Sequence, residues 1–338
     1  MAILTGGIGW KGFMKVSSSE VGSGKVLPFN TEDLVERVEA INNDGIHGGG
    51  VSELNGIFGS RHNIAIGVAT YTGSINGDVF GGTGQYADAF RILLDHAMGR
   101  SSADHTHRLM GFSEAYPIIV SPTGETTYQY PSQTVINRKT GATDTLTTPV
   151  KAVIGNMTIN GNSGGNVNYT AAIQATSRRE VTGVKPTTAD FSFEAVSNLD
   201  DSNPIPFWQA AFNVTGSGED FGGGSYTLRD YITDFSLTIN NNTQPVYTFN
   251  GNNVATDMVQ GLMEITGSFS YYSPTGIFTA NLNNGCTLDL TLGGITLHSP
   301  YMFLPTAPVP SGGLNSIITR NVEFSCLATA AGASLYIL

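Results

Sequence analysis

The sequence predicts a mainly β protein built from two tandem sandwich or barrel modules with little helix. Charged residues make up only 13% of the 338 residues, apolar residues 40%, and there are 42 glycines. This apolar share is enough for a proper core, and abundant glycine suits the turns between short strands. Beyond residue 110, nearly every segment alternates or is followed by a turn, which is typical of such modules.

The first 60 residues carry the weakest pattern. Residues 1–26 are rich in Gly and Ser and hold one strand candidate at 13–16. In the following segment, Thr31 is a good helix N-cap, and a stripe of apolar residues follows it. The stripe consists of Leu34, Val35, Val38 and Ile41. It predicts a short helix, with an extended segment as the alternative, and the glycines of 43–60 predict a long flexible loop.

The clearest helix of the sequence follows a strand. Residues 62–77 alternate like a strand, and the segment 85–98 has helical spacing. Its apolar face comprises Tyr86, Phe90, Leu93, Leu94 and Ala97, and Gly99 suits the C-terminal stop.

The rest of the chain is expected to form strands joined by turns. The expected strands are 116–120, 126–130, 150–160, 166–175, 189–195, 207–214, 226–239, 245–250, 258–272, 286–297 and 321–328. The polar residues between 239 and 245, "NNNTQP" with its neighbours, are expected to form a hairpin turn that Pro245 ends.

Two local similarities favour a division into two modules, residues 1–185 and 186–338. "NMTINGNSGGNVNYT" (156–170) resembles "SLTINNNTQPVYTF" (236–249), and "TYTGSI" (70–75) resembles "EITGSF" (264–269). Their orders along the chain differ, so they do not form a simple collinear repeat. The alternative is coincidence among strands rich in Thr and Asn.

Three of the expected strands have one apolar face and one face of hydroxyls and amides, because side chains alternate along a strand. The polar faces carry a few acids and almost no Lys or Arg. A sheet facing bulk solvent usually carries charges of both signs. These faces are therefore expected to meet something other than bulk solvent.

Charge, cysteines and hydropathy exclude several classes of protein. The net charge is −11, which disfavours a protein that grips nucleic acid, since phosphate binding depends on Lys and Arg. Cys286 and Cys326 lie in alternating apolar runs and are expected to be buried free thiols. The first residues, "MAILTGGIGWKG", lack the features of a signal peptide, and no membrane span is expected.

No catalytic or metal-binding pattern emerges, so an enzyme is not expected and no cofactor is implied. "DHTH" (104–107) is the only cluster of histidines and is expected to be a polar loop rather than a metal site. "GSGK" (22–25) lacks the Ser or Thr that follows the lysine of a phosphate-binding loop.

The order of several segments resembles the tail tube proteins of long-tailed bacteriophages, in their larger two-module form. The segments are "VLPFNTEDLVERV", "GVATYTGSI", a helix ending in "LLDHAMG", "IPFWQAAFNV", "SLTINN" and "MVQGLMEITGSFSYY". None is diagnostic alone, but they occur in series over residues 26–338.

The resemblance implies stacked rings that form a tube with a β-lined lumen, through which DNA passes into the host. It implies that the polar strand faces line this lumen, at Asn156, Thr158, Asp234, Ser236, Thr238, Glu264, Thr266 and Ser268. It also implies that the glycine-rich loop contacts the next ring, through Gly45, His47, Gly48, Gly49, Gly50 and Glu53.

The same resemblance implies the partners and the location. A homotrimer with pseudo-sixfold symmetry is favoured and a hexamer is the alternative, with the tape-measure protein and transiting DNA in the lumen and a sheath protein as a further candidate. The protein would be assembled in the bacterial cytoplasm and end in the virion tail. Two other hypotheses are a carbohydrate- or receptor-binding virion protein and a β-rich hydrolase, although the second lacks a visible constellation of catalytic residues.

Overall fold

One antiparallel sheet of 14 strands draws its strands from both halves of the sequence. The computed structural model of the protein describes residues 13–17, 25–42, 64–98, 118–120, 126–128, 135–139, 145–150, 152–182, 203–216, 226–227, 231–259, 261–272, 286–305, 310–311, 319–327 and 335–337. Eleven strands of the sheet follow one another in space. Their order is β16 (Tyr226–Thr227), β15 (Ala211–Gly216), β21 (Cys286–Leu292), β22 (Ile295–Phe303), β24 (Thr319–Cys326), β20 (Glu264–Tyr272), β17 (Ile232–Asn240), β11 (Val153–Asn162), β12 (Asn168–Ala175), β5 (Ile64–Asp78) and β3 (Thr31–Glu32).

Three further strands join this sheet at its sides. β4 (Val35–Asn42) pairs with β5, β23 (Pro310–Ser311) with β24, and β25 (Tyr336–Ile337) with β22. A second sheet has five strands in the order β13 (Ser177–Thr182), β10 (Thr145–Val150), β9 (Val135–Lys139), β1 (Phe13–Ser17) and β2 (Lys25–Val26). Three two-stranded pairs complete the strands: β6 (Phe80–Gly81) with β14 (Asn203–Pro204), β7 (Ile118–Val120) with β8 (Thr126–Tyr128), and β18 (Gln244–Val246) with β19 (Asp257–Val259).

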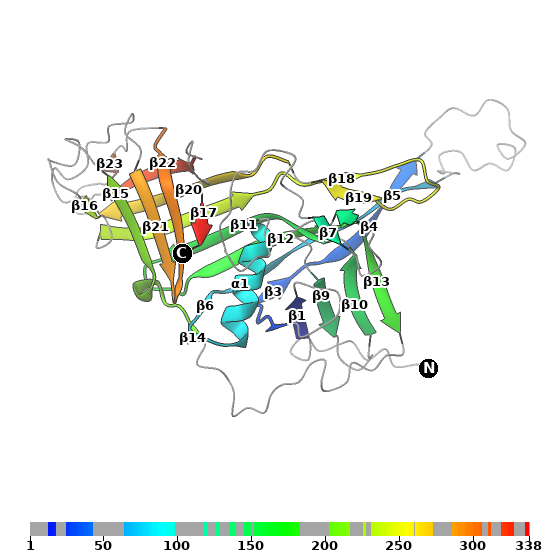
Figure 1. Ribbon diagram of the computed structural model, residues 1–338, viewed down its shortest axis with the longest axis horizontal. Helices are drawn as coiled ribbons and strands as arrows, with labels where there is room; N and C mark the ends of the chain where they lie inside the picture. The colour runs from blue at the N-terminus through cyan, green and yellow to red at the C-terminus, as the bar shows by residue number, and fades with distance from the viewer. Residues whose placement is uncertain are drawn as a thin grey trace, which may run out of the picture.

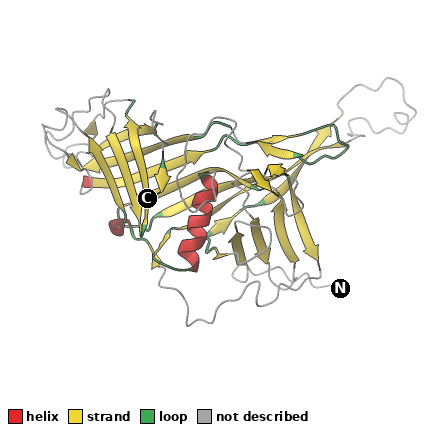
Figure 2. Ribbon diagram, in the orientation of Figure 1, coloured by secondary structure: helices red, strands yellow, loops and turns green. Residues whose placement is uncertain are grey.

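The buried face of the main sheet has a different cover in each half. In the first half the cover is α1 (Gln85–Ala97), which lies against β11 in the middle of the molecule (Figures 1 and 2). The helical spacing places Phe90, Leu93 and Leu94 in the core, where Phe90 contacts the buried ring of Tyr169 with centroids 5.5 Å apart. The predicted helix 85–98 is therefore found at its expected position.

In the second half the sheet curls over and covers itself. Phe212 lies on β15, near one end of the strand order, yet its ring is 5.1 Å from Phe235 on β17 and 5.4 Å from Phe269 on β20. Figure 1 shows β15, β21 and β22 crossing beside β17 and β20. Aromatic side chains bury a large apolar area, so this cluster gives the sandwich its core.

Asn241 joins the two halves just after β17 ends. Its side-chain amide is buried and donates to the carbonyl of Ala97 at the end of α1, at 2.6 Å, and to that of Ile154, at 2.8 Å. Its backbone N–H donates to the carbonyl of Gly155 at 2.8 Å. One residue of the second half thus satisfies a helix-end carbonyl that has no partner within the helix.

A hairpin arm extends the same connection across the first half. β18 and β19 lie beside β4 and β5 at one end of the molecule in Figure 1. The backbone N–H of Ala69 on β5 donates to the carbonyl of Asn253 at 2.7 Å, and Ala69 also forms a bridge with Val254. The arm of the second half therefore adds to the edge of β5 beyond the point where β12 ends.

Some sequence-based predictions are wrong, each because a distant partner or a turn overrides the local pattern. The segment 31–41 forms β3 and β4 instead of a helix, so the extended alternative is correct, because the long strand β5 offers it an edge. Pro245 does not end a hairpin turn but lies in β18 opposite Met258. The segment 286–297 is two strands, because Gly293 and Gly294 have φ of 51° and 106° and form the tight turn that such angles favour.

Other expectations fall outside the described residues or stay predictions. The expected strand 189–195 and the loop 43–60 lie outside the described part of the chain. The division into two modules at residue 185 remains a prediction. Strands of the main sheet come from both sides of this residue. Among the described residues, no helix is long and apolar enough to cross a membrane.

Replacing Asn241 with Ala should destabilise the fold by roughly 1–3 kcal/mol, because two buried carbonyls lose their donor. Urea unfolding followed by circular dichroism measures the change. Asn321→Ala is the matched control, since Asn321 is exposed on β24. Equal stability of the two variants would contradict a structural role for Asn241.

His96 predicts a loss of stability in acid. The side chain lies in the last turn of α1, and burial lowers the pKa of His96 from 6.5 to about 4. Between pH 6.5 and 4, His96 is protonated in the unfolded chain but stays neutral in the folded chain. The free energy of unfolding therefore falls as the pH drops through this range, by up to about 3 kcal/mol. Unfolding of the wild type and of His96→Gln across this range measures the difference, and parallel pH profiles would refute it.

Candidate functional site

A continuous polar surface covers the side of the main sheet opposite to α1 and the aromatic cluster; we call it the polar face. Its central row crosses six neighbouring strands, β5, β12, β11, β17, β20 and β24, at directly opposed positions. The row consists of Asn76, Thr170, Thr158, Thr238, Thr266 and Ser325. Every member is a hydroxyl or an amide, and none is charged.

The neighbouring rows add a few acidic residues. The next row consists of Asp78, Asn168, Asn160, Ser236, Ser268 and Glu323. On either side of these two rows, Asp234 lies between Asn162 and Ser270, and Glu264 lies opposite Asn240. These rows therefore hold four carboxylates and no Lys or Arg, whereas Arg37 on β4 lies opposite Thr70 at the edge of the same face.

The polar groups of this surface bind one another. The hydroxyls of Thr158 and Thr238 are 3.1 Å apart across the β11–β17 contact. The side-chain amide of Asn76 donates to the hydroxyl of Thr170 at 3.0 Å. Such cross-strand pairs stabilise the sheet and occupy groups that would otherwise bind a ligand.

The eight residues predicted to line a lumen all lie on this face, on three adjacent strands. Asn156 and Thr158 are on β11, Asp234, Ser236 and Thr238 on β17, and Glu264, Thr266 and Ser268 on β20. Thr158, Thr238 and Thr266 are opposed in one row. All eight are partly or fully exposed in the single chain. The residues predicted to contact a next ring, Gly45, His47, Gly48, Gly49, Gly50 and Glu53, lie outside the described residues.

The outer strands of this face were not predicted from the sequence. Thr72, Ser74 and Asn76 alternate on β5 with the buried residues Tyr71 and Ile75. The alternation was visible in the sequence, but the neighbours of β5 were not, so the extent of the surface emerges only from the pairing.

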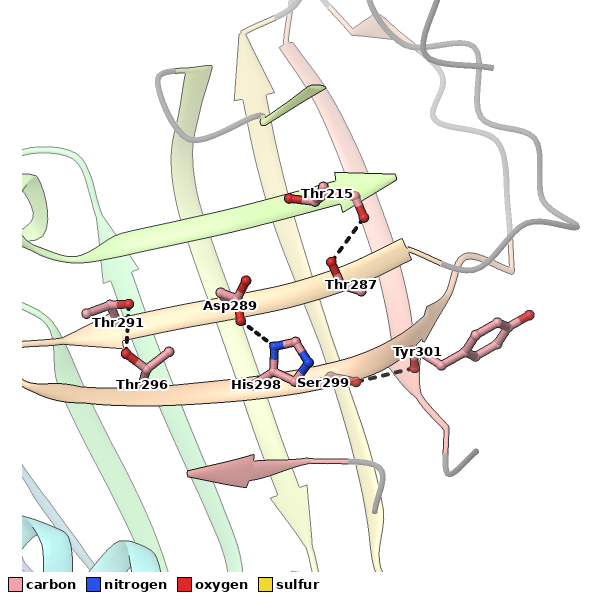
Figure 3. A network of polar contacts seen from close by, with 8 residues as sticks. All are labelled: Thr215, Thr287, Asp289, Thr291, Thr296, His298, Ser299 and Tyr301. Carbon is pink, nitrogen blue, oxygen red and sulfur yellow. Dashed lines mark hydrogen bonds and ion pairs between the residues drawn. The ribbon is translucent and has the colours of Figure 1, made fainter. Parts of the chain in front are cut away.

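A second polar network lies on the outer side of β21 and β22 (Figure 3). His298 Nδ1 lies 2.5 Å from the Asp289 carboxylate, and the hydroxyls of Thr291 and Thr296 are 3.1 Å apart. The hydroxyl of Thr287 donates to the carbonyl of Thr215 at 3.3 Å. These contacts join neighbouring strands and need no ligand to account for them.

The described residues offer little else for chemistry. Nowhere in the described part of the chain do three or more His, Cys, Asp or Glu side chains come close enough to hold a metal ion. Cys286 and Cys326 are buried free thiols, as expected, and burial raises the pKa of each to about 11. A thiol with so high a pKa is mostly protonated at neutral pH and reacts poorly.

One exposed aromatic residue stands beside a shallow groove. Trp208 is 76% exposed and follows Phe207, whose ring stacks on Phe235 at 6.3 Å. The groove beside it is lined by Asn166, Pro206 and the turn 163–165.

The fold and this surface define a β-sheet protein whose largest functional feature is a sheet face. Comparison with protein families identifies the class further. The family of phage tail tube proteins matches residues 51–326, which is most of the chain, and the protein therefore belongs to that family. It is accordingly a structural component of the phage tail. A comparison with curated proteins gave no match.

Proposed function

We propose that the protein forms stacked rings that make the tail tube, and that the polar face lines the lumen through which DNA reaches the host. The rows of hydroxyls and amides across six strands are the observation that carries this proposal. A wall of this kind holds DNA weakly, because tight binding needs Lys or Arg to displace the counterions of the phosphates. The four carboxylates add repulsion.

The proposal gives the protein a structural role with no enzymatic activity. Its partners are further copies of itself, favoured as a homotrimeric ring with two modules per chain, with a hexamer as the alternative. The tape-measure protein and DNA would occupy the lumen, and a sheath protein is a candidate outside. The subunits would assemble in the bacterial cytoplasm.

Binding of a carbohydrate or receptor is the second candidate function, and Trp208 is the observation that favours it. An exposed indole beside a shallow groove can stack on a sugar ring. It is one residue, however, whereas the polar face spans six strands. A subunit that stays monomeric at high concentration and binds glycans would favour this candidate over the tube.

Negative-stain electron microscopy of the purified protein tests the tube directly. The wild type should form rings or tubes with a central hole of a few nanometres. Deleting residues 46–50, in the loop predicted to contact the next ring, should leave a folded subunit that forms rings but does not extend tubes. Tubes of normal length from the deletion variant would refute the stacking role of the loop.

Reversing the charge of the polar face should impair DNA delivery and spare assembly. Asp234→Lys with Glu264→Lys places two cations on strands that remain paired, so tubes should still form. DNA should then bind to the wall and pass slowly, with a binding strength that falls as salt rises. Plaque counts, DNA release from particles and microscopy of the tubes measure delivery and assembly separately.

The matched control is Asp234→Asn with Glu264→Gln, which removes both charges and adds no cation. Delivery by this variant should stay close to that of the wild type. Failure of the double lysine variant to assemble, or normal delivery by it, would show that these residues do not face the lumen.

A further inference from the structure

The main sheet contains the same four-strand arrangement twice. In the first half, the strands follow one another in space as β4, β5, β12 and β11. In the second half, the order is β17, β20, β24 and β23. Neighbouring strands are antiparallel throughout both sets. The order along the chain is also the same in both sets: the strand that is first in space comes first, then the second, then the fourth and finally the third.

The second strand of each set aligns residue for residue. "TYTGSI" on β5 and "EITGSF" on β20 each place a glycine on the buried side, Gly73 and Gly267. A Cβ at Gly73 would lie 2.6 Å from Leu34 Cα, and a Cβ at Gly267 would lie 2.3 Å from the carbonyl oxygen of Ser236. In both sets the neighbouring strand, which in the first set runs from β3 through Leu34 into β4, therefore approaches the same glycine closely.

The remaining strands keep this alignment. Gly73 pairs with Ile173 on β12, and Gly267 pairs with Phe324 on β24; both partners are buried. Four residues before Ile173, Tyr169 pairs with Ile159 on β11. Four residues before Phe324, Arg320 pairs with Pro310 on β23. Pro310 and Ser311 thus occupy the positions of Ile159 and Asn160.

Inside the chain, the last strand of the first set pairs with the first strand of the second set. This is the β11–β17 contact, in which Asn160 is opposite Ser236 and Ile159 is opposite Leu237. In the described part of the chain, β4 has a strand on one side, β5, and β23 likewise has only β24. These are the two strands that correspond to β17 and β11.

We infer that the ring closes when the edge formed by β3 and β4, residues 31–42, of one copy pairs with β23 of the next copy, in the register of the β11–β17 contact. The inference rests on the proposed function and names the surface through which copies of the chain meet. By this register, Asp33 lies opposite Ser311 of the neighbouring copy, and Val35 takes the place of Thr238. The contact repeats an interface that the chain already contains.

The chemistry of the two edges gives the contact a direction. Pro310 has no backbone N–H, so β23 offers carbonyl acceptors and lacks a donor at that position. Two β23 edges are therefore poor partners for each other, whereas β4 contains no proline. A head-to-tail contact of this kind generates a closed ring when its rotation fits. It also occupies the start of a long strand edge, residues 31–42, that would otherwise promote aggregation.

Thiol cross-linking tests the contact in assembled rings. Val35→Cys and Ser311→Cys would be diagonal neighbours across it, roughly 7–8 Å apart, within reach of a short bismaleimide. This pair avoids Asp33, whose carboxylate accepts hydrogen bonds from Ser74. The native cysteines are buried, and the pKa of each is raised to about 11, so the wild type should give no product.

The double variant, and a mixture of the two single variants, should give covalently linked chains on a denaturing gel. The matched control combines Val35→Cys with Ser268→Cys. Ser268 lies on the same face but on β20, the third strand from the contact, so this variant should give no linked chains. Electron microscopy of the same samples records whether rings are present.

This contact would be refuted if rings form but positions 35 and 311 are not linked, or if Val35→Cys alone gives linked chains. Either result would still be compatible with the proposed tube. A wild type that forms neither rings nor tubes would overturn the proposed function, and this inference with it.

Discussion

The contact between β11 and β17 joins the two halves of the main sheet and sets their register. Seven opposed residue pairs join the two halves. Thr158 lies opposite Thr238 on the polar face, and the next pair, Ile159 and Leu237, lies on the buried face. Because side chains alternate, a slip of one residue would turn the apolar set towards the polar face. The buried amide of Asn241 lies at the end of β17 and bonds to β11 and to α1 at once. It therefore holds the register where the halves meet.

One continuous sheet with two different covers follows from this contact. The first half is covered by a helix and the second by its own strands, through Phe212 and its neighbours. Both covers lie on the buried side, so the opposite side can continue unbroken from β5 to β24. The width of the polar face is thus a consequence of packing on the other side of the sheet.

The sequence predicts strands well where one face is buried, and poorly where pairing decides. The alternation of β11, β17 and β20 placed all eight candidate residues on one side, and the spacing of Phe90, Leu93 and Leu94 located the helix. β4 was not predicted with the same success, because Leu34, Val35 and Val38 fit a helical stripe and the partner β5 lies some thirty residues further on. The two "TIN" segments and the two "TGS" segments take different places in the sheet. Thr158 and Thr238 are neighbours across the sheet, whereas the repeat lies in the two "TGS" segments.

The proposed passage of DNA along the polar face requires a surface that differs from one that binds DNA. Binding sites hold groups ready for a ligand, whereas the hydroxyls of Thr158 and Thr238 and the polar groups of Asn76 and Thr170 already contact each other. A passing strand would have to break such pairs to form its own hydrogen bonds, so the net gain would be small. The four carboxylates would add repulsion of phosphate. Weak interaction over a wide area is therefore the property that this face supplies, and it requires the uncharged rows to remain complete across the whole sheet.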